Sequence, residues 1–384
     1  MKKFLTASVA GVMALTCMGQ QALFDKSNII SPEINGDNSV TFRIYAPKAE
    51  EVKVAGDFAA GPQAMTKDGN GVWSFTTGPL TPELYMYSFD IDGVRTLDPS
   101  NVYMIRDVAT VTNIFTIDGE GSPAHNYMVN DVPHGTVSKV WYESPGLVKK
   151  RRMSVYTPPG YEEGNESYPV FYLLHGAGCD EEAWPALGRA SQILDNLIAE
   201  GKAEPMIVVM TNGNAVQSAA PGESAEGLVV PGFDVSRMNR GEFETAFPDV
   251  VNYIDTHYRT KTDKANRAIA GLSMGGYHSL HISKQYPDMF DYVGLFSAAI
   301  MPPEGSQAEI YKDFDGKLKT QFEKQPKLYW IGIGEDDFLY EDNVNFRKIL
   351  DANSYPYEYL ETPGGHIWKN WRIYLSEFAP RLFK

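Results

Sequence analysis

The chain has 384 residues, 43% of them hydrophobic, so it is long enough for two domains and apolar enough for a sizeable core. Its formal net charge of -15 argues against nucleic acid or an anionic membrane surface as partner, because both carry negative charge themselves. We therefore expect a globular protein with a neutral or carbohydrate partner.

Residues 1–19 have the layout of a secretory signal peptide. Two lysines follow the initial methionine, and an apolar run then extends from Phe4 to Met18. A lipoprotein anchored through Cys17 is the alternative, but residues 14–16 match poorly the sequence that usually precedes a lipid-bearing cysteine. We expect a secreted or periplasmic protein with no membrane span, in which Cys179 is the only cysteine and no intramolecular disulfide forms.

Residues 28–118 form short alternating runs separated by Gly, Asp, Asn and Pro, a pattern typical of an all-β sandwich. Apolar and polar residues alternate from Val40 to Tyr45, and Asp92-Gly93 marks a hairpin turn. Three strand aromatics would either form a platform for sugar rings or pack in the core: Trp73, Tyr85 and Tyr87. Core packing is favoured, because aromatic residues in strands more often pack there.

The segments Val40–Pro47 and Val52–Phe58, followed by Trp73, resemble an immunoglobulin-like module. Modules of this kind are related to the family 48 carbohydrate-binding modules and precede the catalytic domain in many bacterial esterases. They do not always bind sugar, so the resemblance leaves carbohydrate binding by this domain open.

Residues 119–136, rich in Gly, Pro, Asn and Asp, are predicted to be a linker, and residues 137–384 a second domain with alternating strands and helices. The segments Val140–Tyr142 and Arg152–Tyr156 look like an antiparallel strand pair. Continuous apolar runs predict buried parallel strands at Val170–Leu174, Met206–Met210, Ala268–Ala270, Val293–Phe296 and Leu328–Ile333. Helices are predicted at Ser191–Glu200, Phe243–Tyr258 and Arg372–Phe383. The expected architecture is a mostly parallel sheet flanked by helices.

The sequence Gly271-Leu272-Ser273-Met274-Gly275-Gly276 follows a short apolar run and leads into a helical pattern. This is the arrangement of a nucleophile elbow, in which a serine sits in a strained turn and the glycines remove side chains that would collide. The motif alone is short and occurs by chance, but its place between a strand and a helix favours Ser273 as a nucleophile. The backbone N–H of Met274 is then one oxyanion donor.

A general base and an acid are expected downstream, in the order Ser, Asp, His. Of the seven histidines, His366 follows the predicted last strand in a glycine-rich loop, where it can reach the elbow and act as the base. The run Gly334-Glu335-Asp336-Asp337 offers the acid, and spacing alone leaves the choice open. We select Asp337, with Asp336 next and Asp342 third.

The second oxyanion donor is expected in the glycine-rich loop after the strand Val170–Leu174, with Ala177 the best candidate. Predicted loops at the same edge of the sheet carry side chains that could bind substrate: Trp184, Asn212, Asn214, Phe233 and Trp368. We expect no cofactor and no metal ion, because no cluster of His, Cys and Asp has ligand spacing.

Together, His175–Gly178, the elbow, Gly334–Asp337 and Gly364–His366 look like the putative esterase family of α/β-hydrolases. Within it, the chain is most similar to feruloyl and acetyl-xylan esterases, in which the acid is the third residue after the strand-terminal glycine. This resemblance supports Asp337. It implies a secreted serine carboxylesterase that removes feruloyl or acetyl groups from plant cell-wall xylan.

Two alternatives stay open. Enterobactin-type siderophore esterases have a comparable two-domain layout. A non-catalytic carbohydrate-binding protein with a degenerate hydrolase domain is the other, although the complete set Ser273, His366 and Asp337 argues against it.

Overall fold

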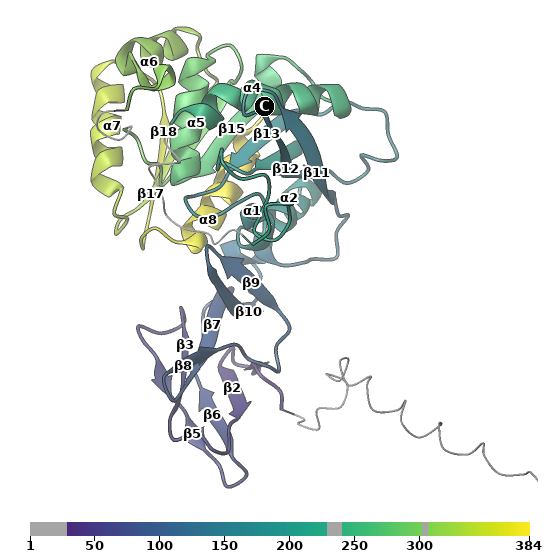
Figure 1. The fold of residues 1–384 in the computed structure, drawn as a ribbon, viewed down its shortest axis with the longest axis vertical. Coiled ribbons are helices and arrows are strands. Elements are labelled where there is room, and N and C mark those ends of the chain that lie inside the picture. The colour runs from purple at the N-terminus through teal and green to yellow at the C-terminus, as the bar shows by residue number, and fades with distance from the viewer. Residues whose placement is uncertain (1–28, 229–239, 302–305) are drawn as a thin grey trace, which may run out of the picture. The chain divides into compact units, whose positions relative to one another are not determined.

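The computed structural model describes residues 29–228, 240–301 and 306–384 (Figure 1). The predicted signal peptide lies outside the described residues. The chain divides into two compact units. The first runs to Leu80 and includes Ser88–Val102, and the second comprises Thr81–Tyr87 and Tyr103–Lys384.

The first unit is all-β. One sheet has the order β1 (Glu33–Ile34), β2 (Val40–Tyr45), β6 (Val72–Thr76) and β5 (Thr66–Lys67). In the other, β3 (Val52–Gly56) lies between β4 (Gln63–Ala64) and β7 (Glu83–Ile91), and β8 (Val94–Thr96) pairs with the second half of β7. The alternation of apolar and polar residues along β2 places Val40, Phe42 and Ile44 in the core, where all three are buried.

The three strand aromatics are all buried. Trp73 is 8% exposed, and its indole N–H donates to the carbonyl of Ala46 over 2.9 Å. Tyr85 and Tyr87, which belong to the second unit, are 8% and 1% exposed. The predicted core packing is therefore what the structure has, and these rings present no platform to a sugar.

The second unit is built on an eight-stranded sheet (Figure 1). Its strands, in spatial order, are β11 (Thr136–Ser144), β12 (Lys149–Thr157), β14 (Ile207–Thr211), β13 (Val170–Leu174), β15 (Arg267–Leu272), β16 (Tyr292–Phe296), β17 (Leu328–Gly334) and β18 (Glu358–Thr362). The pairs β11–β12 and β12–β14 are antiparallel, and the remaining neighbours are parallel. Each apolar run predicted as a parallel strand falls on one of these strands, so the predicted α/β architecture is confirmed.

Helices cover both faces of this sheet. Alternate strand residues divide between two cores: Phe171 and Leu173 pack with one set of helices, and Tyr172 and Leu174 with the other. The first set is α1 (Ala183–Ala186), α2 (Ala190–Ala199), α8 (Trp368–Phe378) and the 3-10 helix η2 (Pro123–Tyr127). The second is α4 (Glu242–His257), α5 (Met274–Gln285), α6 (Phe314–Glu323) and α7 (Tyr340–Ala352). Burial on both faces explains why the strands read as continuous apolar runs.

Three short 3-10 helices complete the described elements: η3 (Lys264–Asn266), η4 (Glu309–Tyr311) and η5 (Ala379–Arg381). The last helix α8 begins and ends earlier than the predicted Arg372–Phe383. It stops before η5 because Pro380 has no N–H to continue an α-helical ladder.

Residues 81–87 and 103–136 are part of the second unit, whereas residues 88–102 belong to the first. Strand β10 (Thr110–Ile117) pairs with residues 83–87 on one side and with β9 (Met104–Asp107) on the other. The segment 119–136, predicted as a linker, contains η2, whose Tyr127 is fully buried in the core of the second unit. The amide of Asn196 donates to the carbonyl of Met128 over 3.0 Å.

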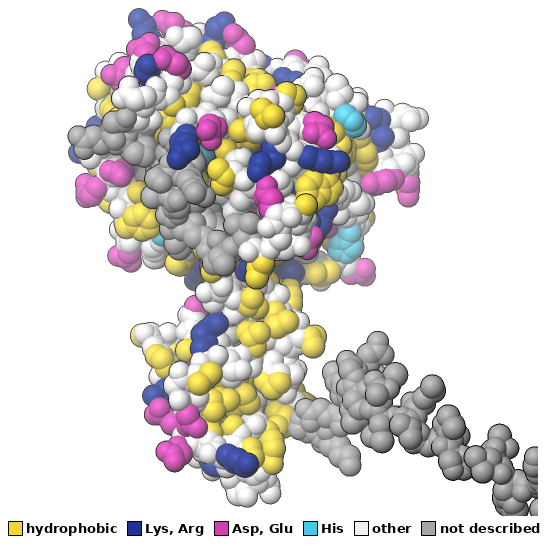
Figure 2. Space-filling model, viewed as in Figure 1, with side chains coloured by type: hydrophobic (Ala, Val, Ile, Leu, Met, Phe, Trp, Pro, Cys, Tyr) yellow, Lys and Arg dark blue, Asp and Glu magenta, His cyan; other side chains and the backbone are white. Residues whose placement is uncertain are grey.

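Acidic side chains are interspersed with lysine and arginine over the face of the second unit drawn in Figure 2. Within the described ranges, no helix has both the length and the apolar character needed to cross a bilayer.

Candidate active site

Ser273 lies in the tight turn between β15 and α5. Its backbone is strained, with φ 53° and ψ -115°, a conformation that L-residues rarely adopt. The flanking glycines make the turn feasible: a Cβ on Gly271 would lie 2.5 Å from the backbone of Gly275, and one on Gly275 would lie 2.4 Å from the carbonyl oxygen of Leu174. The N–H of Ser273 donates to the carbonyl of Phe296 over 2.9 Å, which holds the turn against β16.

His366 and Asp337 come together from two neighbouring loops after β17 and β18. The Nδ1 atom of His366 is 2.9 Å from Oδ2 and 3.0 Å from Oδ1 of Asp337. Backbone bonds join the two loops: the N–H of Asp336 donates to the carbonyl of Gly364, and that of Glu335 to the carbonyl of Thr362. Asp337 is buried, whereas the side chains of Asp336 and Asp342 are exposed.

The carboxylate of Asp337 is held in its charged form. Burial by itself would raise its pKa, but the hydrogen bonds from His366 and from the backbone N–H of Leu339 outweigh that effect, so the pKa lies below its ordinary value. A charged carboxylate accepts a hydrogen bond, so the proton of the neutral imidazole is on Nδ1. Nε2 then carries no proton and can act as an acceptor. That tautomer is the one a general base requires.

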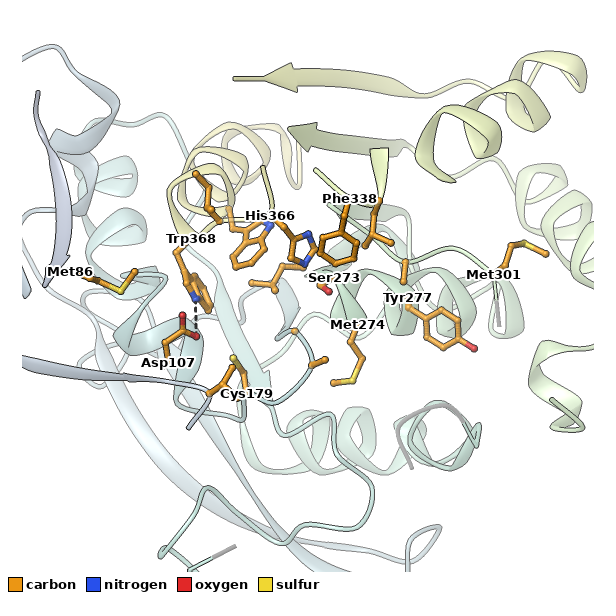
Figure 3. Close-up of a pocket in the computed structure, with 18 residues that line it drawn as sticks. Met86, Asp107, Cys179, Ser273, Met274, Tyr277, Met301, Phe338, His366 and Trp368 are labelled. Carbon is orange, nitrogen blue, oxygen red and sulfur yellow. Dashed lines mark hydrogen bonds between the residues drawn. The ribbon is translucent and has the colours of Figure 1, made fainter. Parts of the chain in front are cut away.

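Ser273 and His366 line the same cavity of about 760 Å³, as do Ala177 and Met274 (Figure 3). Met274 is the first residue of α5, so its N–H has no partner within the helix. Its position next to Ser273, at the positive end of the helix dipole, suits an oxyanion donor. The structure thus brings five predicted residues to one region. Four of them line the cavity, and the fifth, Asp337, contacts it through its hydrogen bond to His366.

His175 holds the loop that carries Ala177. Its Nδ1 is 2.7 Å from the carbonyl oxygen of Gly176, and its Nε2 accepts from the N–H of Gly213 over 2.7 Å. Burial lowers its pKa to about 4, so the ring is neutral at neutral pH. Both ring nitrogens are occupied, which makes His175 a brace between two loops.

The predicted substrate-binding residues are divided by the structure. Trp368 lines the cavity. Trp184 is buried beside it, ring centroids 5.5 Å apart, and donates its indole N–H to the carbonyl of Leu174. Asn212 and Asn214 are buried, with their amides bonded to Glu181 and to the carbonyl of Cys179, and they do not line the cavity. Phe233 lies outside the described residues.

Sequence reasoning missed several cavity residues. Tyr277 stands one helical turn after Ser273 on α5, and Phe338 directly follows Asp337, so both carried a positional signal. Trp371 on α8 also lines the cavity, edge-on to the His366 ring at 4.9 Å. Asp107 comes from β9, far from the elbow in sequence, and had no local signal.

No group of His, Cys, Asp or Glu side chains in residues 29–228, 240–301 and 306–384 is arranged to hold a metal ion.

Comparison with known proteins finds matches over both parts of the chain. Residues 144–382 match the family described as putative esterase, and residues 30–103 match carbohydrate-binding module 48 (isoamylase N-terminal domain). The chain is 35% identical over 363 residues to an endo-1,4-beta-xylanase/feruloyl esterase of Xylanibacter ruminicola. That match covers 92% of this chain and 46% of the relative, so the chain spans about half the relative's length.

Two solved structures illustrate the fold. A ferulic acid esterase of Anaeromyces mucronatus, in complex with ferulic acid, is 28% identical with a TM-score of 0.55, over 68% of this chain and 96% of the other. The enterobactin esterase of Shigella flexneri has a TM-score of 0.64 over 90% of this chain and 92% of its own, but at 17% identity it shows the fold alone. The chain belongs to the putative esterase family of α/β-hydrolases, and its residues 30–103 are similar to carbohydrate-binding module 48.

Proposed function

We propose that the protein is a secreted or periplasmic serine esterase that removes feruloyl or acetyl groups from hemicellulose. The observation that carries the proposal is that the strained Ser273 lines one cavity with His366, and that Nδ1 of His366 is bonded to Asp337. That combination supports acyl transfer through a covalent intermediate.

In the proposed mechanism, Oγ of Ser273 attacks the ester carbonyl while Nε2 of His366 takes its proton. Asp337 fixes the tautomer and stabilises the imidazolium. The N–H groups of Ala177 and Met274 hold the oxyanion of the tetrahedral intermediate. His366 then gives the proton to the leaving alcohol, and water, activated by the same base, hydrolyses the acyl-enzyme.

The size and lining of the cavity favour a large acyl group. A volume of about 760 Å³ far exceeds an acetyl group, and the walls include Trp368, Trp371 and Tyr277. An aromatic acyl group would bury its ring against such walls. Xylanase and feruloyl esterase in the name of the Xylanibacter relative point to the same class of substrate.

The proposal extends to location and to the first unit. A secretory leader at residues 1–19 would bring the enzyme to extracellular polysaccharide, and the carbohydrate-binding module suits a polymeric substrate. Detection of the mature protein in the periplasm or medium, with residues 1–19 removed, would support this part. Retention of the full-length chain in the cytoplasm would contradict it.

The test is product release from feruloylated arabinoxylan fragments, acetylated xylan and a catecholate siderophore, with wild type and Ser273→Ala compared. We expect wild type to release ferulate, acetate or both, and Ser273→Ala to lose about 10⁴- to 10⁶-fold in kcat. Cleavage of the siderophore alone would move the chain to iron acquisition. No cleavage of any ester by folded wild type would favour a non-catalytic carbohydrate-binding protein.

A further inference from the structure

The two ends of the cavity differ in exposure. At one end, Phe338 is 76% exposed and Met301 is 62% exposed (Figure 3). At the other, Cys179, Trp368 and Trp371 are at most 6% exposed. A polysaccharide must extend into solvent from the ester that is cleaved, so the exposed end suits the sugar chain. The buried end, which is apolar, suits the acyl group.

One charged side chain interrupts the apolar wall of the buried end. Asp107, at the end of β9, lines the cavity with Met86 and Val108, all three within the second unit (Figure 3). Its Oδ1 accepts from the indole Nε1 of Trp368 over 3.5 Å, at the outer limit of a hydrogen bond. Desolvation raises the pKa of this carboxyl group, more than the indole and Arg106 lower it.

Asp107 has acceptor capacity to spare. Among the described residues, the indole of Trp368 is the only hydrogen-bond partner that its side chain has. The neighbouring Arg106 is engaged elsewhere, with one guanidinium nitrogen 2.5 Å from Asp180 and another donating to the carbonyl of Val108. A partly desolvated carboxylate with an unused oxygen gains from a donor supplied by a ligand.

The turn that presents Asp107 is strained and braced. Val108 has φ 51°, a left-handed conformation that is unfavourable for a β-branched residue. The bond from Arg106 to its carbonyl, and the ion pair of Arg106 with Asp180, hold the turn in place. Strain of this kind persists where the surroundings fix it, and here it places Val108 and Asp107 together on the cavity wall.

We propose that Asp107 is a specificity-determining residue that accepts a hydrogen bond from a hydroxyl group at the far end of an aromatic acyl group. The inference rests on the proposed esterase function and deepens it: the preferred substrates are esters of cinnamic acids with a free para-hydroxyl group. The ring lies against Trp368 and Trp371 at the buried end, and the phenol donates to the free oxygen of Asp107.

The consequence is discrimination against a methyl ether. A para-methoxy group has no proton to donate, and it would displace water from Asp107 without replacing the lost hydrogen bond. A site built to bind a hydroxyl group rejects the analogue that lacks it more strongly than an apolar pocket rejects an added methyl group. An acetyl group is too short to reach Asp107, so its hydrolysis is indifferent to that residue.

The experiment compares kcat/KM for methyl 4-hydroxy-3-methoxycinnamate and methyl 3,4-dimethoxycinnamate, with 4-nitrophenyl acetate as internal standard. Wild type is expected to prefer the free phenol by about 10- to 100-fold. Asp107→Ala brings this ratio close to one, and Asp107→Asn keeps part of it because the amide oxygen still accepts. Asp131→Ala, at an exposed aspartate outside the cavity, leaves the ratio unchanged. Activity on 4-nitrophenyl acetate stays within a few-fold of wild type in Asp131→Ala, and in every variant it is the reference rate to which both cinnamate rates are normalised.

The outcomes separate the inference from the function on which it rests. A wild-type preference that survives in Asp107→Ala, with nitrophenyl acetate activity intact, overturns the role of Asp107 alone. Wild type that cleaves nitrophenyl acetate but neither cinnamate overturns the substrate class as well. If Asp107→Ala fails to fold, the ratio in Asp107→Asn decides, because an unchanged ratio there excludes a charge-assisted bond. If Asp107→Ala lowers kcat/KM for feruloyl arabinose but leaves the ratio between the two methyl cinnamates unchanged, the buried end binds the alcohol part of the ester and the inference is overturned.

Discussion

Two histidine–carboxylate pairs of the second unit, His366–Asp337 and His278–Glu244, have nearly the same geometry and very different surroundings. In both, Nδ1 lies 2.9 Å from a carboxylate oxygen: His366 with Asp337, and His278 with Glu244. The side chain of His366 is 17% exposed, whereas those of His278 and Glu244 are 0% exposed. Only His366 has its ring on the cavity that Ser273 lines.

The difference lies in what the second nitrogen meets. Nε2 of His278 is buried and has no hydrogen-bond partner in the part of the chain that the structure describes, and a Cβ on Gly213 would lie 3.4 Å from it. Phe243 packs edge-on to the ring at 4.8 Å, and the hydroxyl of Tyr311 donates to the same Glu244 oxygen over 2.7 Å. The same pair of side chains is thus a packing element in one place and a candidate base in the other. Access to Nε2, and not the carboxylate contact, separates the two.

Activity should separate the two histidines most strongly. His366→Ala removes the proposed base and should lower kcat on 4-nitrophenyl acetate by about 10⁴- to 10⁶-fold. His278→Ala, which leaves Ser273 and its base in place, should lower kcat by less than about tenfold in the fraction that folds. Active-site titration with a fluorophosphonate corrects for that fraction. Comparable kcat losses in the two variants would contradict the assignment.

The carboxylate of the cavity pair should matter nearly as much. Asp337→Asn leaves the shape intact but presents an amide that favours the wrong tautomer of His366, and kcat should fall by about 10⁴-fold. Asp336→Asn is the matched control, since its side chain is exposed one residue away. Steady-state kinetics of both variants on one ester make the measurement. Activity that depends on Asp336 instead would reassign the acid.

Stability should reverse the order of the two pairs. His278→Ala leaves Glu244 buried with the hydroxyl of Tyr311 as its one donor among the described residues, and removing one partner of a buried pair lowers the free energy of unfolding by about 3–5 kcal/mol. His366→Ala should change it by about 1 kcal/mol or less, because its partly exposed site admits water. Urea unfolding at pH 7 measures both. A larger loss for His366→Ala would mean that exposure does not distinguish the pairs.

These contrasts also mark where sequence reasoning succeeds. The elbow could be predicted because its glycines are required by backbone contacts within a few residues, and the sheet because burial on both faces makes whole strands apolar. Asp337 could not be separated from Asp336 by spacing, since adjacent loop residues point in different directions. Only the fold shows which of them is buried beside His366.

The predicted residues that lie away from the cavity and the cavity residues that sequence reasoning missed have a common cause. Asn212 and Asn214 stand at the expected edge of the sheet, but their amides turn inward to bond Glu181 and the carbonyl of Cys179. Asp107 meets Trp368 across 261 positions of sequence, a contact that no local pattern encodes. Loop position can be predicted from sequence, whereas side-chain direction and long-range contacts depend on packing.

A third histidine sharpens the comparison through pH. Both ring nitrogens of His175 are hydrogen-bonded, and burial lowers its pKa from the ordinary 6.5 to about 4. As pH falls from 6.5, the unfolded chain takes up this proton first, so the free energy of unfolding falls by about 3 kcal/mol in total. The loss is complete near pH 4, where the folded state is protonated too.

Urea unfolding between pH 7 and 4 should show this slope in wild type and a flatter one in His175→Gln, which has no proton to gain. His281, whose pKa is also lowered by burial, contributes equally to both proteins and cancels in the difference. If the free energy of unfolding depends on pH equally in the two proteins, the pKa of His175 is not lowered by folding. The ring that holds the Ala177 loop would then be protonated in the folded state over the same pH range as in the unfolded chain.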